Sequence, residues 1–291
     1  MSDQTKNGLI PKQGLSPEDL AEIKALRDIC NTYEDLTIKL NWDMLSNRPA
    51  DQTNDFLFYQ DNQLIGFLGT YTFGRQEAEI SGMVHPDYRR QGIFRQLTDA
   101  AREEYKRLGI PKFLFIVQSN SVGGKAFAES YGATYTFSEH RMKLTQDVPE
   151  FAKYDLDMRI ATEEDLPILS RLNAIGFDMP EADGQDYAKD VMANAHDRTW
   201  IVSEDGQPLA KISAMVSEPG KGFIFGFCVD PDYRGRGYGR QILSKTIRDL
   251  IAEERTFIEL EVACENARAL TLYESCGFVV TKADDYYEIG V

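Results

Sequence analysis

The chain has 291 residues, of which 42% are hydrophobic and 27% charged, and its formal net charge is −15. This acidic balance repels phosphate backbones, so it argues against nucleic acid as a partner. The first residues are polar and no run of about 18 apolar residues occurs, which argues against a signal peptide and a membrane span. We therefore expect a cytoplasmic protein with no membrane partner, and the length favours two domains.

Cysteine and histidine usage indicates a reduced protein without a bound metal. The cysteines show no CxxC spacing and the histidines show no spacing typical of metal ligands. Isolated cysteines in apolar or helical segments are usually small buried hydrophobes. The residues concerned are Cys30, Cys228, Cys264 and Cys276, and His85, His140 and His196.

The first half begins with a weak strand signal at Leu9-Ile10, and a helix is predicted from Pro17 with Ser16 as its cap. Paired strands are predicted over 56–59 and 64–73, around a turn at Asp61-Asn62, and a third strand over 78–84. A long amphipathic helix over 94–108, a strand over 113–117 and a short helix ending at Gly132 follow.

The second half repeats this order. A strand is predicted over 156–160, a helix opens at Thr162, and a hairpin covers 200–203 and 209–216. Next come a strand over 223–229, a helix over 240–254, a strand over 257–262 and a short helix ending at Gly277. The pattern predicts a mixed α/β fold, with domains at 1–148 and 156–291 and a linker at 149–155.

Two segments of the halves match directly. The run 84–94, Val-His-Pro-Asp-Tyr-Arg-Arg-Gln-Gly-Ile-Phe, returns at 229–239 as Val-Asp-Pro-Asp-Tyr-Arg-Gly-Arg-Gly-Tyr-Gly. Pro86 and Pro231 are 145 positions apart (231 − 86), and Gly132 and Gly277 are separated by the same 145 (277 − 132). One register without a gap covers both matches, which is typical of a duplicated domain.

The loop 234–239 lies directly before a predicted helix. Unpaired N–H groups at a helix start, glycines that allow close approach and arginines together favour an anion such as phosphate. A dinucleotide-binding loop is the alternative, but its glycines would run GxGxxG and not GxGxG. Glu259 and Glu261, about 20 residues on, keep that alternative open because an acid at this distance binds ribose.

These segments resemble the GCN5-related N-acetyltransferase (GNAT) family. The resemblance rests on the strand end 229–233, the loop 234–239 and the closing segment 266–278, which carries Asn, Ala and Tyr at the family's spacing. Residues 200–278 match in order, and 56–144 match more loosely. The whole resembles two tandem acyl-CoA acyltransferase domains, each with a mixed, mostly antiparallel central sheet flanked by helices.

The resemblance implies acetyl-CoA as cosubstrate and gives each matched position a role. The backbone of Phe227, Cys228 and Val229 would meet the acetyl-pantetheine arm, and Asn266 would bond the pantetheine chain. The pyrophosphate would be held by Arg234, Gly235, Arg236, Gly237, Tyr238 and Gly239. The corresponding positions of the first half are Met83, Val84, Arg89, Arg90, Gln91 and Gly92.

Acetyl transfer to an amine requires a base and a group that assists the departing thiolate. The resemblance places Tyr273 near the sulfur, as the general acid, with an aromatic packing residue of the last helix as the alternative. Glu259 and Glu261 share one face of a predicted strand and are the candidate bases, with solvated edge carboxylates as the alternative. Cys228 suggests a covalent route, but it has no nearby histidine, and the resemblance implies direct transfer.

The two halves are not equally equipped. At the offset of 145, Tyr273 corresponds to Ala128, Asn266 to Ser121, and Gly239 to the bulky Phe94. The first half keeps Arg89, Arg90, Gln91 and Gly92. The resemblance makes Glu79 its candidate base, because family members use acids on this strand. We expect the second domain to be catalytic and the first to be structural, to shape the acceptor site, or to bind CoA without turnover.

The function predicted is therefore acetyl-CoA-dependent transfer to a primary amine of a small molecule or peptide, by a monomer or homodimer. A CoA-binding interaction protein without transfer is the alternative. The acidic charge either concentrates cationic amines near a cleft or only maintains solubility. Tyr71, Phe73, Phe177 and Tyr187 are candidates to line an acceptor pocket, or core residues.

Overall fold

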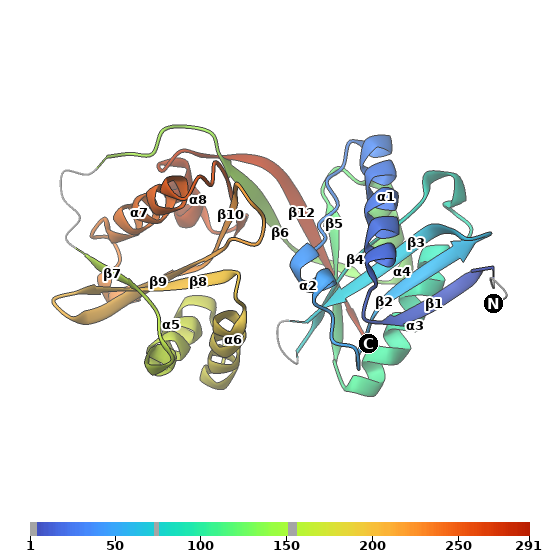
Figure 1. The fold of residues 1–291 in the computed structure, drawn as a ribbon, viewed down its shortest axis with the longest axis horizontal. Coiled ribbons are helices and arrows are strands. Elements are labelled where there is room, and N and C mark those ends of the chain that lie inside the picture. Colours follow the sequence, from blue (N-terminus) through green and yellow to red (C-terminus); the bar gives the residue numbers. More distant parts are fainter. Residues whose placement is uncertain (1–4, 73–75, 151–155) are drawn as a thin grey trace. The chain divides into compact units, whose positions relative to one another are not determined.

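The computed structural model describes residues 5–72, 76–150 and 156–291 (Figure 1). Phe73 and residues 151–155 of the predicted linker lie outside these ranges. The chain forms two compact units, the first comprising residues 1–138 and 284–291 and the second residues 139–283. None of the helices in the described ranges is long and apolar enough to cross a membrane.

The first unit contains a mixed sheet in the order β1-β2-β3-β4-β5-β12, in which only β4 and β5 are parallel. The strands are β1 (Gly8–Gln13), β2 (Thr53–Gln60), β3 (Gln63–Tyr71), β4 (Ala78–Val84), β5 (Lys112–Gln118) and, from β12 (Phe278–Gly290), residues 284–290. The helices are α1 (Pro17–Glu34), α2 (Trp42–Ser46), α3 (Ile93–Leu108) and α4 (Val122–Tyr131).

Two apolar layers hold this unit together. Ile23, Leu26 and Leu45 of α1 and α2 pack on one face of the sheet, and α3 and α4 pack on the other face (Figure 1). The predicted helix start is confirmed, because the Ser16 side chain accepts the Asp19 N–H and the Asp19 carboxylate accepts the Ser16 N–H. The weak signal at Leu9-Ile10 is part of strand β1.

The second unit repeats the arrangement in the order β6-β11-β10-β9-β8-β7, with β10 and β11 parallel. Its strands are residues 139–144 of β6 (Thr134–Leu144), β7 (Asp157–Ile160), β8 (Asp197–Glu204), β9 (Gln207–Met215), β10 (Lys221–Val229) and β11 (Phe257–Ala263). Its helices are α5 (Leu166–Phe177), α6 (Glu181–Ala193), α7 (Tyr238–Ala252) and α8 (Ala267–Glu274).

The faces of the second sheet differ in what covers them. Residues of β8 to β11 such as Ile212, Ile224 and Leu260 pack with α7 and α8 in one core. Ile201 packs with Leu169 of α5 and Ala188 of α6 on the opposite face. Because side chains alternate along a strand, the neighbours of the first set point toward the α5/α6 face.

The two units obtain their last strands from distant parts of the chain. In the first unit, residues 284–290 of β12 pair with β5, from Asp284 opposite Gln118 to Gly290 opposite Lys112. In the second unit, residues 139–143 of β6 pair with β11. The predicted domains were 1–148 and 156–291, whereas the structure assigns residues 284–291 to the first unit and residues 139–148 to the second.

The residue correspondence between the two units shifts by one within β10. Val84 and Val229 end their strands at the offset of 145, but Ala78 pairs with Phe113 whereas Gly222 pairs with Ile258. The offset upstream is therefore 144 (222 − 78), because β10 carries one extra residue at a register break between Phe225 and Cys228. Glu79 consequently occupies the position of Phe223.

Candidate functional site

Both repeated loops have the same backbone. Short 3₁₀ turns at 86–88 and 231–233 precede Arg89 and Arg234, each with φ −68° and ψ 160°. Gly92 and Gly237 then begin α3 and α7 with φ of 77° and 81°, a left-handed conformation that favours glycine. Neither helix start has a side-chain cap, so backbone N–H groups remain there as donors for an anion.

The first arginine of each loop is fixed in the same way. The Arg89 Nε donates to the Val84 carbonyl at 3.1 Å, and the Arg234 Nε donates to the Val229 carbonyl at 2.8 Å. Arg236 lies over the Tyr233 ring and donates to the Asp232 carbonyl. These contacts hold the guanidinium groups beside the helix starts.

The parallel strands of each unit separate where they reach the loop. Pairing of β4 with β5 ends at Ile80 and Phe115, and pairing of β10 with β11 ends at Ile224 and Leu260. Beyond these residues each strand continues for several residues without that partner strand. Such a gap leaves backbone groups that an extended ligand can pair with.

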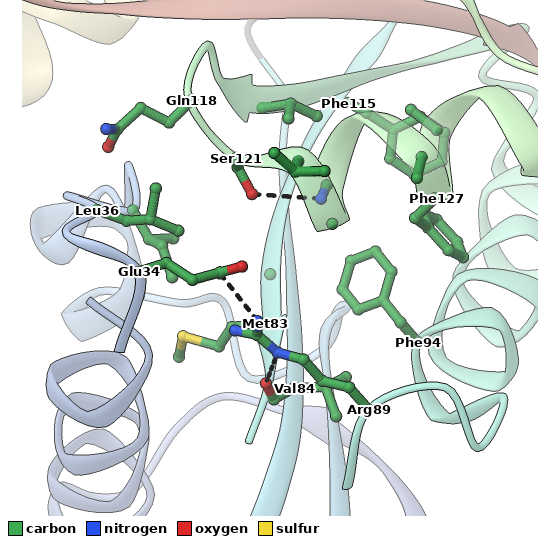
Figure 2. Close-up of a pocket in the computed structure, with 18 of the residues that line it drawn as sticks. Glu34, Leu36, Met83, Val84, Arg89, Phe94, Phe115, Gln118, Ser121 and Phe127 are labelled. Carbon is green, nitrogen blue, oxygen red and sulfur yellow. Dashed lines mark hydrogen bonds and ion pairs between the residues drawn. The ribbon is translucent and has the colours of Figure 1, made fainter. Parts of the chain in front are cut away.

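In the first unit the gap opens into a cavity of about 840 Å³ (Figure 2). Its walls come from β4, β5, the starts of α3 and α4, and the end of α1. Figure 2 shows Phe94, Phe115 and Phe127 on one side and Glu34 with Leu36 on the other. The predicted residues Met83, Val84, Arg89, Arg90 and Gly92 all line it, and Gln91 lies between them in the chain.

Phe94 does not obstruct this cavity, contrary to what its size suggests. Its ring lies against Gly82, where a Cβ would come within 2.6 Å of it, and stacks edge-on against Phe127 at 4.7 Å. In the second unit the sizes are reversed, because Phe227 of β10 lies near Gly239 of α7. Each unit thus places one aromatic ring and one glycine between strand and helix.

Glu34 was missed by the sequence analysis. Its carboxylate lies 2.9 Å from the Arg89 guanidinium (Figure 2). The same guanidinium lies over the Tyr33 ring. This ion pair joins the end of α1 to the loop before α3, at the edge of the cavity. No sequence signal indicates it, because the partners are 55 residues apart (89 − 34).

Tyr273 and Ala128 occupy matching places in α8 and α4. Tyr273 is 9% exposed, packs edge-on against Phe278, and belongs to the core under α7 and α8. Burial raises the pKa of its phenol to about 12. Ala128 is fully buried and lines the first cavity.

Asn266 and Ser121 also match, since both are N-caps of their helices. The Asn266 side chain accepts the Ala269 N–H at 3.1 Å, and the Ser121 hydroxyl accepts the Gly124 N–H at 3.2 Å. Ser121 lines the first cavity. Tyr238 follows Gly237, and its hydroxyl donates to Glu204.

Glu259 and Glu261 lie on the face of the second sheet that is opposite α7 and α8, while Ile258, Leu260 and Val262 are buried on the other. The interpretation of these acids as edge carboxylates is wrong, because β11 lies between β10 and β6. Burial raises the pKa of Glu259, although nearby Arg141 and Lys143 oppose the shift. Glu261 lies 3.6 Å from the Arg141 guanidinium.

Cys228 and Lys211 are buried neighbours on β10 and β9. Burial raises the pKa of the Cys228 thiol, which disfavours the thiolate that a covalent route would need. Lys211 was missed by the sequence analysis, although a lysine inside the apolar run 209–215 was a visible signal. Its burial lowers the pKa of the amine to about 8.

In the described ranges, no group of three or more His, Cys, Asp or Glu side chains is placed to hold a metal ion. The structure therefore defines a protein with a duplicated α/β domain. Each copy has a loop suited to binding phosphate, beside two parallel strands that separate.

Comparison with known proteins gives this class its name. The Acetyltransferase (GNAT) family matches residues 21–133 and 168–278. The chain therefore belongs to the GNAT family of acetyltransferases, and it is an N-acetyltransferase with two GNAT domains in tandem.

Individual relatives match over different lengths. A mycothiol acetyltransferase of Kineococcus radiotolerans is 27% identical over 80% of both chains, and one of Propionibacterium freudenreichii is 25% identical over 94% of this chain and 89% of its own. A mycothiol acetyltransferase of Beutenbergia cavernae is 37% identical over only 31% of each chain. The bS18-alanine N-acetyltransferase of Salmonella typhimurium is 44% identical over 19% of this chain and 37% of its own.

Solved structures share the fold over nearly the whole chain. A GCN5-related N-acetyltransferase from Sphaerobacter thermophilus has a TM-score of 0.79 at 16% identity, covering 99% of this chain and 97% of its own. A tandem GNAT protein from the clavulanic acid biosynthesis pathway has a TM-score of 0.75 at 17% identity, covering 97% and 98%. The tandem arrangement predicted from the repeat is confirmed.

Proposed function

We propose that the second unit transfers an acetyl group directly from acetyl-CoA to a primary amine, and that the first unit binds CoA without turnover. The observation that carries the proposal is the gap between β10 and β11. Tyr273 lies in the core on the α7/α8 side of this sheet, and Glu259 and Glu261 lie on its opposite face. A thioester in the gap would have its sulfur toward the phenol and its carbonyl toward the carboxylates.

The cofactor would be held mainly by backbone. Phe227, Cys228 and Val229 lie beyond the last β10–β11 pair, so they are placed to pair with the pantetheine arm. The pyrophosphate would lie on the N–H groups at Gly237 and the start of α7, with Arg234 and Arg236 beside it. Asn266 uses its carbonyl oxygen as a helix cap, so its amide nitrogen is the donor for the pantetheine chain.

The chemistry requires a neutral acceptor amine. Glu259 is the better base of the two acids, because its raised pKa makes its carboxylate more basic, whereas Glu261 is paired with Arg141. Backbone N–H groups near Cys228 and Val229 would stabilise the oxyanion. Tyr273 would assist the departing thiolate, and the acetyl group would pass directly to the amine.

The first unit has the binding features but not the phenol. Its cavity contains the Arg89 loop, the start of α3 and apolar walls, which supports binding of an acyl-CoA. Ala128 replaces the tyrosine, which supports the absence of turnover there. The name of the relatives that match nearly the whole chain favours a small-molecule acceptor. The shorter match to an enzyme that acts on a protein alanine supports a peptide acceptor.

Two charge-reversal variants test the division of labour. We expect calorimetry to show two acetyl-CoA sites in the intact protein. Arg234→Glu with Arg236→Glu should weaken one site at least tenfold, and Arg89→Glu with Arg90→Glu should weaken the other, because each loop loses its charge-assisted bonds to phosphate. Release of CoA thiol in the presence of a panel of amines should be lost only in the first of these variants.

A matched control reverses two exposed charges away from both loops, Lys24→Glu and Lys106→Glu. This control should bind acetyl-CoA as the intact protein does. Thiol release that follows the Arg89/Arg90 variant would assign catalysis to the first unit. Binding at both sites without thiol release from any amine would favour a non-catalytic interaction protein.

A further inference from the structure

Lys211 is a buried amine that the proposed transfer does not use. It lies in the middle of β9, opposite Cys228 of β10, and is 2% exposed. Lysine side chains are almost never fully buried unless they are paired with an acid. The neighbours of Lys211 therefore decide what its amine can do.

Aromatic and neutral polar groups surround this amine. The Nζ atom lies 5.3 Å from the centre of the Phe177 ring of α5 and 5.5 Å from that of the Tyr187 ring of α6. Lys211 shares a small cavity of about 10 Å³ with other residues of α5, α6, β8 and β9, including Asn173, Thr199 and Ser213. Burial raises the pKa of the Tyr187 phenol to about 12 and also raises that of the Cys228 thiol, so these groups are uncharged at neutral pH.

The amine also lies close to the point where β10 and β11 begin to separate. A Cβ atom on Gly226 would be 3.1 Å from Nζ. Gly226 has φ 57° and lies in the register break that follows Ile224, the last residue of β10 paired with β11. The residues after Gly226 are those assigned above to the acetyl-pantetheine arm. The amine is therefore beside the strand segment where a thioester would be held.

We propose that Lys211 is an internal acetyl acceptor, and that the second unit transfers the acetyl group of bound acetyl-CoA to Nζ of Lys211. This inference rests on the proposed binding of acetyl-CoA in the second unit. The Nζ lone pair attacks the thioester carbon, a C–N bond forms and the C–S bond breaks. CoA leaves as the thiolate, which takes up the proton lost from nitrogen, so the products are acetyl-lysine and CoA thiol.

The amine is chemically suited to this step. With a pKa of about 8, the amine of Lys211 is neutral far more often than that of an exposed lysine. At pH 7 the neutral fraction is roughly 200-fold larger than for a lysine with the ordinary pKa of about 10.4. The product carries no charge, so acetylation also removes the cost of burying an ammonium group.

Acetyl-lysine at position 211 needs more room than the small cavity around the Lys211 amine provides. A cavity of about 10 Å³ holds no more than a water molecule. Phe177 covers the amine from the end of α5 and is 40% exposed. Of the residues around the amine, its ring is therefore the one that can turn outward and make room. An acetylated Lys211 would then lie on the face of the sheet that also carries Glu259 and Glu261.

The test needs acetyl-CoA alone and no knowledge of the external acceptor. The intact protein is incubated with isotopically labelled acetyl-CoA and then analysed by peptide mass spectrometry. We expect label on Lys211 to form at least tenfold faster than label on Lys221, a half-exposed lysine of β10. Lys211→Arg should lose that label, and Lys221→Arg should retain it. Lys211→Met, which matches the side chain in size, provides a second variant if arginine disturbs the fold.

A second arm separates enzymatic transfer from chemical acetylation. Arg234→Glu with Arg236→Glu leaves Lys211 unchanged but removes the proposed phosphate contacts, so the label on Lys211 should fall at least tenfold. Label that persists in this variant, or an unlabelled Lys211 in a protein that binds acetyl-CoA at the second unit by calorimetry, would overturn the inference. If calorimetry shows no binding at the second unit, the proposed function fails and the inference fails with it.

Discussion

Replacement of Tyr273 by phenylalanine should lower turnover by roughly 10- to 100-fold, since a hydrogen bond to a charged group contributes about 1.5–3 kcal/mol. The affinity for acetyl-CoA should change little, because in the proposed binding mode the backbone of β10 and the loop before α7 would provide the binding contacts. The phenol is buried and its pKa is about 12, so it keeps its proton at neutral pH. We therefore expect it to act chiefly as a hydrogen-bond donor to the developing thiolate.

Two measurements together check this expectation. Steady-state release of CoA thiol gives the turnover, and calorimetry gives the affinity for acetyl-CoA. Tyr131→Phe is the matched control, because Tyr131 lies in the corresponding helix of the first unit and its hydroxyl bonds to Asp99. Equal turnover in Tyr273→Phe and the unchanged protein would show that the phenol takes no part. A parallel loss of affinity would show that Tyr273 is a packing residue of the site.

Replacement of Lys211 by methionine should stabilise the second unit by about 3 kcal/mol near neutral pH. Burial lowers the pKa of the amine to about 8 in the folded state from 10.5. The difference of 2.5 units corresponds to about 3 kcal/mol, since one unit is worth 1.36 kcal/mol. Methionine fills the same space without an ionisable group, so the variant avoids this cost.

The stabilisation should depend on pH in one direction only. Below about pH 8 the amine is protonated in both folded and unfolded chains, so the intact protein carries the full cost. Between about 8 and 10.5 the unfolded chain binds more protons than the folded one, and the stability of the intact protein rises with pH. Above that range both states are neutral, and the advantage of the methionine variant should vanish.

Urea unfolding at about pH 7 and about pH 10 measures this change. The chain has two tryptophans, Trp42 in the first unit and Trp200 in the second. A Trp42→Phe background therefore makes fluorescence report on the second unit. Lys221→Met is the control, because Lys221 is half-exposed and a surface substitution changes stability by about 0.5 kcal/mol or less. An advantage for Lys211→Met that is equal at both pH values would contradict the assigned shift.

Local sequence patterns predicted the repeated loops well. The conformation at Gly92 and Gly237 follows from the glycines and the helix start, which are contained in a few consecutive residues. The helix cap at Ser16 is equally local and was predicted, whereas the caps at Ser121 and Asn266 were not predicted. The family resemblance used the same short segments, so the fold could be predicted with them.

Other features depend on partners that are remote in the chain. The alternation in β11 predicted the shared face of Glu259 and Glu261, but not that β6 would lie beside them. A one-residue bulge at Gly226 leaves no clear trace in a sequence comparison, although it shifts every upstream pair by one. The size of Phe94 was misleading because Gly82, which makes room for its ring, lies on strand β4 and not near it in helix α3.

The exchange of the last strands has a consequence for how the chain is made. The sheet of the first unit lacks its last strand until residues 284–290 have been synthesised, because these residues of β12 pair with β5. Between Ser138 and Gly290 the ribosome adds 152 residues (290 − 138), which takes roughly 10 s or more at common synthesis rates. During that interval the exposed edge of β5 is a place where another chain, or a chaperone, can bind. The order of synthesis thus makes the first unit begin folding first and finish last.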